Sequence, residues 1–137
     1  MSTDSLDAIV EKIAPLGWHV VIYFEAEDLP DLYDFFSAIP TDVVVDHMGR
    51  PDVTKDPEGP EFELFLRFMR ENPNVWTKVS CPERLSATGP RALNGEQHAY
   101  TDVVPFARRV VEEFPDRVLW GTDWPHPNLK DHMPDDG

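Results

Sequence analysis

The stretch RVLWGTDWPHP, residues 117–127, runs from an apolar segment into an aspartate and then into two prolines that flank a histidine. The apolar segment predicts a buried strand. The prolines predict its end, because proline removes a backbone hydrogen-bond donor and fixes φ. Asp123 and His126 are therefore expected on a stiff turn at the tip of a strand. Strand tips are where α/β proteins usually keep their chemistry.

Predicted helices and strands alternate along the chain. Apolar residues recur at helical spacing within residues 6–13, 32–39, 62–69 and 103–114. Short runs rich in β-branched residues lie between them, near residues 19–24, 43–46, 75–79 and 117–122. Helix followed by strand, four times over, predicts an α/β fold with a parallel sheet and right-handed crossovers. The strand runs are continuous rather than alternating, which predicts that helices cover both faces of the sheet.

The charge composition excludes two classes of partner. Of 137 residues, 26 are acidic and 12 are basic, which gives a formal net charge of -14. A nucleic-acid-binding protein needs a basic surface, and an anionic membrane repels an acidic chain, so we expect neither nucleic acid nor membrane as a partner. An anionic substrate would need the few arginines to be concentrated in one place.

Cysteine usage and the absence of long apolar segments favour the cytoplasm. Cys81 is the only cysteine, so no intrachain disulfide can form, as is usual in a reducing compartment. No apolar run approaches the ~18 residues of a membrane span. The N-terminus also lacks the pattern of a signal peptide. We therefore expect a soluble, cytoplasmic protein.

Polar residues follow every predicted strand. They are Tyr23 and Glu25 after the first, Asp46, His47 and Arg50 after the second, Lys78, Ser80 and Arg84 on and after the third, and Asp123 and His126 after the fourth. Because parallel strands end at one rim, we expect these side chains to meet there.

Asp123 and His47 each have two interpretations. Asp123 is either a turn residue or a general base that takes a proton from water, partly desolvated by Trp120 and Trp124. His47 is either a satisfied core histidine or a site residue, since Gly49 allows a close turn just beyond it. For both residues we favour the catalytic interpretation.

The remaining candidates are substrate-binding residues. Arg50 and Arg84 are either surface ion-pair partners or a pair that holds a substrate carboxylate in a bidentate manner. The Tyr23 hydroxyl either packs or binds a carboxylate at the rim. His126 either stiffens its loop or supports the site, and we place it with the substrate-binding set.

No metal or other cofactor is expected. The spacings H-x-H, H-E-x-x-H and C-x-x-C are absent from the sequence. His47 and Asp123 alone are too few ligands for a protein zinc site, which needs three or four. No G-x-S-x-G nucleophile elbow surrounds Cys81, so we interpret it as structural. Two stretches, residues 51–60 and 81–101, are expected to be long loops, and the second is a candidate lid or disordered flap.

Three motifs carry a resemblance to a known family. VVDHMGRP, WTKVSCPERLS and VPFARRVVEEFPDRVLWGTDWPHPN resemble the amidohydrolase-related family of (β/α)8 barrels, and within it the lactone-opening enzymes. The resemblance implies a hydrolase that opens the lactone ring of a small dicarboxylate with water and requires no metal. By similarity, Asp123 activates the water and His47 polarises the lactone carbonyl. Tyr23 and Arg84 hold substrate carboxylates, with Arg50 as a weaker candidate.

The sequence departs from the family pattern in its extent. It has four predicted strands, whereas a (β/α)8 barrel has eight and normally needs about 250 residues. It also lacks the H-x-H pair of the family's first strand. Residues 1–137 are therefore expected to be a partial barrel, from the middle or the C-terminal half of a longer enzyme. The alternatives are a metal-dependent hydrolase or decarboxylase of the same superfamily and a non-catalytic half-barrel. The oligomeric state stays open.

Overall fold

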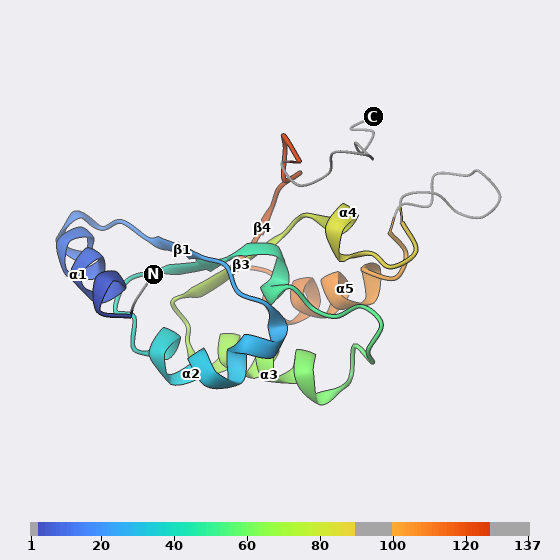
Figure 1. Ribbon diagram of the computed structural model, residues 1–137, viewed down its shortest axis with the longest axis horizontal. Helices are drawn as coiled ribbons and strands as arrows, with labels where there is room; N and C mark the ends of the chain where they lie inside the picture. Colours follow the sequence, from blue (N-terminus) through green and yellow to red (C-terminus); the bar gives the residue numbers. More distant parts are fainter. Residues whose placement is uncertain (1–2, 90–99, 127–137) are drawn as a thin grey trace.

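The computed structural model describes residues 3–89 and 100–126. Within these ranges, four parallel strands form one sheet in sequence order: β1 (Val20–Ile22), β2 (Val43–Val45), β3 (Val75–Val79) and β4 (Val118–Trp120) (Figure 1). Val20 lies opposite Val43, which lies opposite Val75. The predicted strands, their order and their parallel direction are confirmed.

Helices precede or follow each strand, and the apolar spacing predicts all of them except the four-residue α4. They are α1 (Thr3–Ile13), α2 (Leu29–Ser37), α3 (Pro60–Glu71), the short α4 (Pro82–Leu85) and α5 (Val104–Glu113). Three 3-10 turns, η1 (Ala14–Leu16), η2 (Ala26–Asp28) and η3 (Asp46–Gly49), connect them to the strands. Pro60 and Pro105 lie in the first turns of α3 and α5, where the missing N–H leaves no hydrogen bond unmade.

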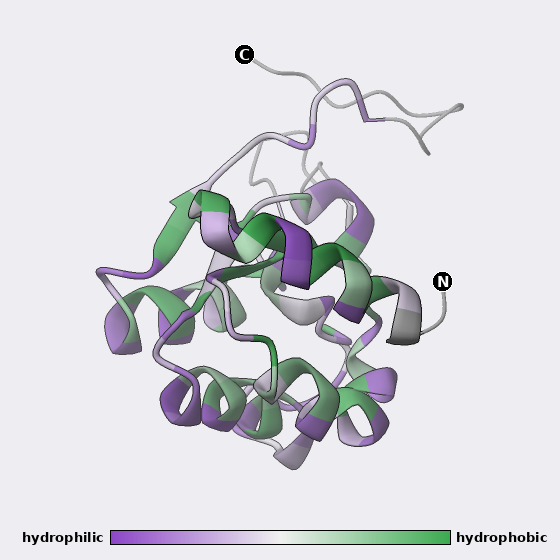
Figure 2. Cartoon of the chain, turned by 90° about the vertical axis from the view of Figure 1, so that its left-hand side faces the viewer, coloured by the Kyte–Doolittle hydropathy of each residue, from purple (hydrophilic) through white to green (hydrophobic). Residues whose placement is uncertain are grey.

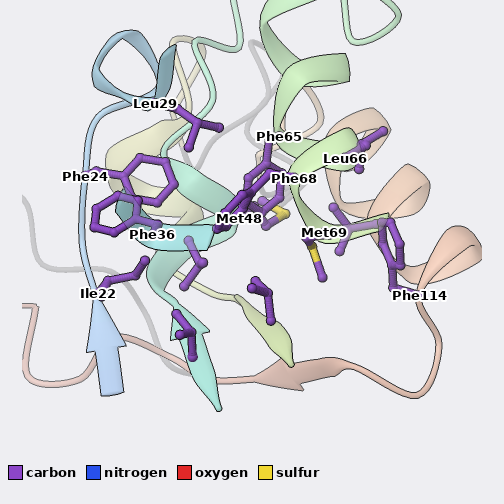
Figure 3. Packing of buried hydrophobic residues seen from close by; sticks show 14 of the residues in the cluster. Ile22, Phe24, Leu29, Phe36, Met48, Phe65, Leu66, Phe68, Met69 and Phe114 are labelled. Carbon is purple, nitrogen blue, oxygen red and sulfur yellow. The ribbon is translucent and has the colours of Figure 1, made fainter. Parts of the chain in front are cut away.

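The core lies between the sheet and the helices on one of its faces. Figure 3 shows Ile22 of β1 and Phe24 packed with Phe36 of α2, and Met69 of α3 close to Phe114. The helices are amphipathic, and in Figure 2 hydrophilic and hydrophobic residues alternate along them. This single layer of helices gives the sheet one well-packed face.

No helix within residues 3–89 and 100–126 covers the other face of the sheet, so for these residues the prediction of two helical layers is wrong. Side chains alternate along a strand, and on this second face Val21 of β1 is 47% exposed and Leu119 of β4 is 40% exposed. In a (β/α)8 barrel the second strand face points into the barrel, where side chains from other strands pack against it. Continuous apolar strands therefore do not require a second layer of helices.

The predicted loop over residues 81–101 is partly helical. Its first residues form α4, and the backbone and hydroxyl groups of residues 86–88 are bound by the carboxylate of Asp102. Residues 90–99, the rest of the expected lid, lie outside the described residues. Residues 51–59 form turns, as expected. Among the described residues, no helix has the length and apolarity needed to cross a bilayer.

The tight turn after β2 yields a prediction about stability. Gly49 has φ +68, and a Cβ there would lie 2.9 Å from the Phe65 ring. Gly17 has nearly the same φ, +67, but open space around it. Gly49→Ala is therefore expected to lower the free energy of unfolding by about 1–3 kcal/mol more than Gly17→Ala, because only the first substitution overpacks the core.

Urea denaturation of both variants measures this difference, and Gly17→Ala serves as the control for the φ penalty alone. Equal urea midpoints for the two variants would contradict the prediction, because they would show that the Phe65 ring moves aside without loss of stability.

Candidate active site

Sharp turns after β2, β3 and β4 bring side chains together at one rim of the sheet. His47 in η3 has φ +54, Cys81 after β3 has φ +61 and Asp123 after β4 has φ +63. These left-handed conformations are uncommon for residues other than glycine, and they cluster at functional sites. Each one turns the chain abruptly at the end of its strand. Sheet geometry and local backbone together therefore build the site.

Arg84, on α4, is the centre of the rim cluster. Its Nη2 lies 3.2 Å from Nε2 of His47 and 3.2 Å from Oδ2 of Asp123. The His47 Nε2 is 3.6 Å from the Asp123 Oδ1. All three side chains are largely buried. The predicted convergence of His47, Arg84 and Asp123 is therefore present in the structure.

The surroundings of His47 favour the neutral imidazole. Burial lowers its pKa below the ordinary 6.5, against the opposing charges of Asp123 and Asp46. Its Nδ1 is 2.8 Å from the hydroxyl of Ser80. Since a guanidinium can only donate, Nε2 accepts from Arg84, and Nδ1 carries the proton and donates to Ser80.

Cys81 has a structural role in the same cluster. It is fully buried, and its sulfur accepts a hydrogen bond from Nε of Arg84 at 2.8 Å. Burial raises the pKa of the thiol to about 12. Cys81 therefore orients the guanidinium and is not a nucleophile at neutral pH.

Glu25 is a rim residue whose role the sequence does not reveal. It accepts a hydrogen bond from the Tyr23 hydroxyl, and its Oε2 lies 3.2 Å from Nε of Arg50. The hydrogen bond from Tyr23 lowers the pKa of Glu25, and the contact with Arg50 lowers it further. The hydrogen bond to Glu25 raises the pKa of Tyr23. The Tyr23 ring also meets the His47 ring edge-on, at 6.2 Å between centroids. Tyr23 and Arg50, which are predicted to bind a substrate carboxylate, therefore both bind the carboxylate of Glu25.

A cavity of about 270 Å³ lies next to the cluster. Arg50 and Arg84 both line it, together with residues of η2, the segment after η3 and α4. The carboxylates of Glu25, Glu27, Asp52 and Glu61 also line it, so an anionic ligand has to compete with them for the two guanidinium groups.

The structure places His126 next to Glu83 and Asp123. Its side chain is buried, and its Nδ1 lies 3.1 Å from Oε1 of Glu83 on α4. This burial supports the loop-stiffening role more than direct contact with a substrate. The expected wall of tryptophans around Asp123 is wrong, because Trp120 and Trp124 are 80% and 73% exposed. Trp120 lies on β4, an edge strand of the sheet that residues 3–89 and 100–126 form.

The described residues contain two groups that resemble metal ligand sets. One is His47, Cys81 and Asp123, and the other is Glu83, Asp123 and His126. The first does not fit a metal ion, because Arg84, already a cation, contacts all three side chains. In the second, Glu83 and His126 already bind each other. We therefore derive no step through a metal.

Comparison with known proteins defines the class of the chain. Residues 2–137 match a family model described as Amidohydrolase, so the chain belongs to the amidohydrolase family. An apo crystal structure from Agrobacterium tumefaciens resembles it with a TM-score of 0.76 at 27% identity, covering 98% of this chain and 45% of that chain. The parallel sheet is thus part of an amidohydrolase (β/α)8 barrel.

Two further proteins point to a narrower group. A 2-pyrone-4,6-dicarboxylate hydrolase from Comamonas testosteroni is 80% identical over 134 residues, which are 98% of this chain and 44% of that protein. A crystal structure of a probable 2-pyrone-4,6-dicarboxylic acid hydrolase from Acinetobacter baumannii, with citric acid bound, has a TM-score of 0.67 at 26% identity and covers 93% of this chain and 45% of that chain. The chain spans less than half the length of the curated relatives it matches.

The enclosed thiol gives a prediction about reactivity. Because Cys81 is buried and its pKa is raised to about 12, it should not react with a thiol reagent in the native protein at a pH of about 8. Denaturant should expose one reactive thiol per chain. Absorbance titration with a disulfide reagent measures both states, and rapid native labelling would contradict the described packing.

The neutral state of His47 gives a prediction about pH. Its folded-state pKa lies below the unfolded value of 6.5, so the unfolded chain binds more protons as the pH falls. The free energy of unfolding should therefore decrease as the pH falls through that value toward the folded-state pKa. His47→Gln should make the free energy of unfolding depend less on pH. One such histidine can contribute up to about 1.4 kcal/mol per pH unit to this dependence.

Urea melts between a pH of about 5 and about 7 measure this slope. His19→Gln, at an exposed histidine before β1, is the control and should keep it. A slope unchanged by His47→Gln would contradict the prediction.

Proposed function

We propose that this chain is part of a hydrolase that uses water to open the lactone ring of a small dicarboxylate such as 2-pyrone-4,6-dicarboxylate. The observation that carries the proposal is the rim cluster, in which a carboxylate, an imidazole and a guanidinium from three strand ends lie within hydrogen-bonding or ion-pair distance. The 80% identity to the Comamonas testosteroni hydrolase supports the same reaction.

In this proposal Asp123 is the general base. Its carboxylate is held at the rim by Arg84, whose Nη2 lies 3.2 Å from Oδ2, and its Oδ1 lies 3.6 Å from Nε2 of His47. A water next to this carboxylate would give up a proton to Asp123 as its oxygen attacks the lactone carbonyl. The ring C–O bond then breaks, the departing ring oxygen takes up the proton that Asp123 holds, and the product is an open-chain acid with one more carboxylate than the substrate.

His47 stabilises the oxyanion that forms on the carbonyl oxygen. This role needs a proton on Nε2, whereas the contact with Arg84 leaves Nε2 as an acceptor. A substrate carboxylate that attracts Arg84 would release Nε2. The Ser80 hydroxyl can then donate to Nδ1, so that Nε2 carries the proton and points to the carbonyl. Substrate binding and assembly of the donor are thus coupled through Arg84.

Arg84, Arg50 and Tyr23 are the proposed carboxylate binders, with His126 supporting the turn beside them. Arg50 and Arg84 line the same cavity. Glu25 accepts hydrogen bonds from Arg50 and Tyr23, so a substrate carboxylate has to compete with Glu25 for these donors. The citric acid bound to the Acinetobacter baumannii protein supports a site for ligands with several carboxylates.

We further propose that residues 1–137 form one partial barrel domain, that the reaction needs no metal and that the protein is cytoplasmic. The place of Arg84 among the potential ligands supports the second point. The buried, unpaired Cys81 supports the third.

A chimera tests the proposed function with this chain's own residues. This chain would replace the matched 44% of the Comamonas testosteroni hydrolase, and loss of the pyrone absorbance would report turnover. The chimera is expected to open 2-pyrone-4,6-dicarboxylate and to keep its activity after treatment with a chelator. Asp123→Asn should lower kcat by about 10²–10⁴, because asparagine keeps the shape but accepts no proton.

Asp42→Asn is the matched control, at an exposed aspartate just before β2 and so at the opposite end of the sheet. A chimera that folds but turns over no lactone would reject the proposed function. Normal kcat in Asp123→Asn would assign the base to another residue.

A further inference from the structure

A second buried pair of charged side chains lies beside the rim cluster. Oε1 of Glu83 on α4 is 3.1 Å from Nδ1 of His126, and the two side chains are only 2% and 3% exposed. A carboxylate taken out of water is costly unless it is paired and hydrogen-bonded. Neither the proposed reaction nor substrate binding requires Glu83, so its burial needs another explanation.

The turn over residues 123–126 connects this pair to the proposed base. The backbone N–H of His126 donates to the carbonyl of Asp123 at 2.8 Å, and both residues have positive φ. Between them Trp124 and Pro125 are exposed to solvent. The buried side chains of the turn are therefore those at its two ends, so these ends determine where the carboxylate of Asp123 lies.

Both ends of the turn are bound by consecutive residues of α4. Arg84 contacts Asp123, with 3.2 Å between Nη2 and Oδ2, and Glu83 contacts His126. Neighbouring residues on an α-helix point about 100° apart, so one short helix can reach two sides of the turn. Arg84 is also the residue that a substrate carboxylate attracts in the proposed mechanism. When Arg84 shifts, the Glu83–His126 pair still holds the turn.

We propose that Glu83 is a positioning residue for Asp123, acting through His126. It keeps the turn in its strained conformation, with the base facing the water, while Arg84 changes partners. The inference rests on the proposed function, and it assigns a role to a residue that never touches the substrate. A misplacement of about 1 Å at a reacting group can cost about 10²-fold in rate, so such support bears directly on kcat.

The chimera described above provides the test. Glu83→Ala is expected to lower kcat by about 10-fold to 100-fold and to change KM by less than about threefold, since the carboxylate binders stay in place. Glu83→Gln keeps an acceptor oxygen for His126, so it should retain most of kcat. Hydrogen exchange of residues 121–126, followed by mass spectrometry, should be faster in Glu83→Ala than in the parent chimera.

Two further variants complete the design. Glu113→Ala removes an exposed carboxylate that pairs with Arg70 on the helical layer, and it should leave kcat, KM and exchange unchanged. Glu83→Asp keeps the charge but withdraws the carboxylate by one methylene. Glu83→Asp should also lower kcat at nearly constant KM. It tests the positioning role if Glu83→Ala does not fold.

The outcomes separate the two proposals. An inactive parent chimera would reject the proposed function and the positioning role together. An active chimera in which Glu83→Ala and Glu83→Asp keep normal kcat, or in which exchange of the turn is unchanged, would overturn the role of Glu83 alone. The positioning role would also be overturned if the loss of activity were fully explained by a smaller fraction of folded protein.

Discussion

The guanidinium of Arg84 is the contact on which the rim depends. It donates to the sulfur of Cys81 and to the imidazole of His47, and it pairs with the carboxylate of Asp123. These partners come from three different strand ends, and a planar group with five donors can satisfy them together. A lysine would supply one point of charge and could not reproduce this geometry. The same cation contacts every member of one potential metal ligand set, His47, Cys81 and Asp123.

The acidity of the chain gives the rim a second property. With a net charge of -14, every arginine at the site is already close to a carboxylate of the protein: Arg84 to Asp123 and Arg50 to Glu25. An incoming anion therefore exchanges one carboxylate partner for another. A ligand with two carboxylates can satisfy both arginines at once, whereas a monoanion leaves one of them with its protein partner.

The sequence predicts those parts of the molecule that follow from local periodicity. Helical spacing and β-branched runs gave the helices and strands, and parallel pairing then placed His47, Arg84 and Asp123 at one rim. The pair Glu83 and His126 was missed because the two residues are 43 positions apart and no pattern marks their burial. Helix α4 has only four residues, too few for a periodic signal. The exposure of Trp120 depends on its edge strand, which hydrophobicity alone does not reveal.

The left-handed residues at the strand ends bear on how this site can be altered. His47, Cys81 and Asp123 occupy backbone conformations that glycine would adopt more easily, by about 1–2 kcal/mol each. A search for thermostable variants that ignores activity would thus tend to replace the very side chains that perform the chemistry. Any stabilisation of the chain is better directed to the helical layer, where sequence and backbone preference already agree.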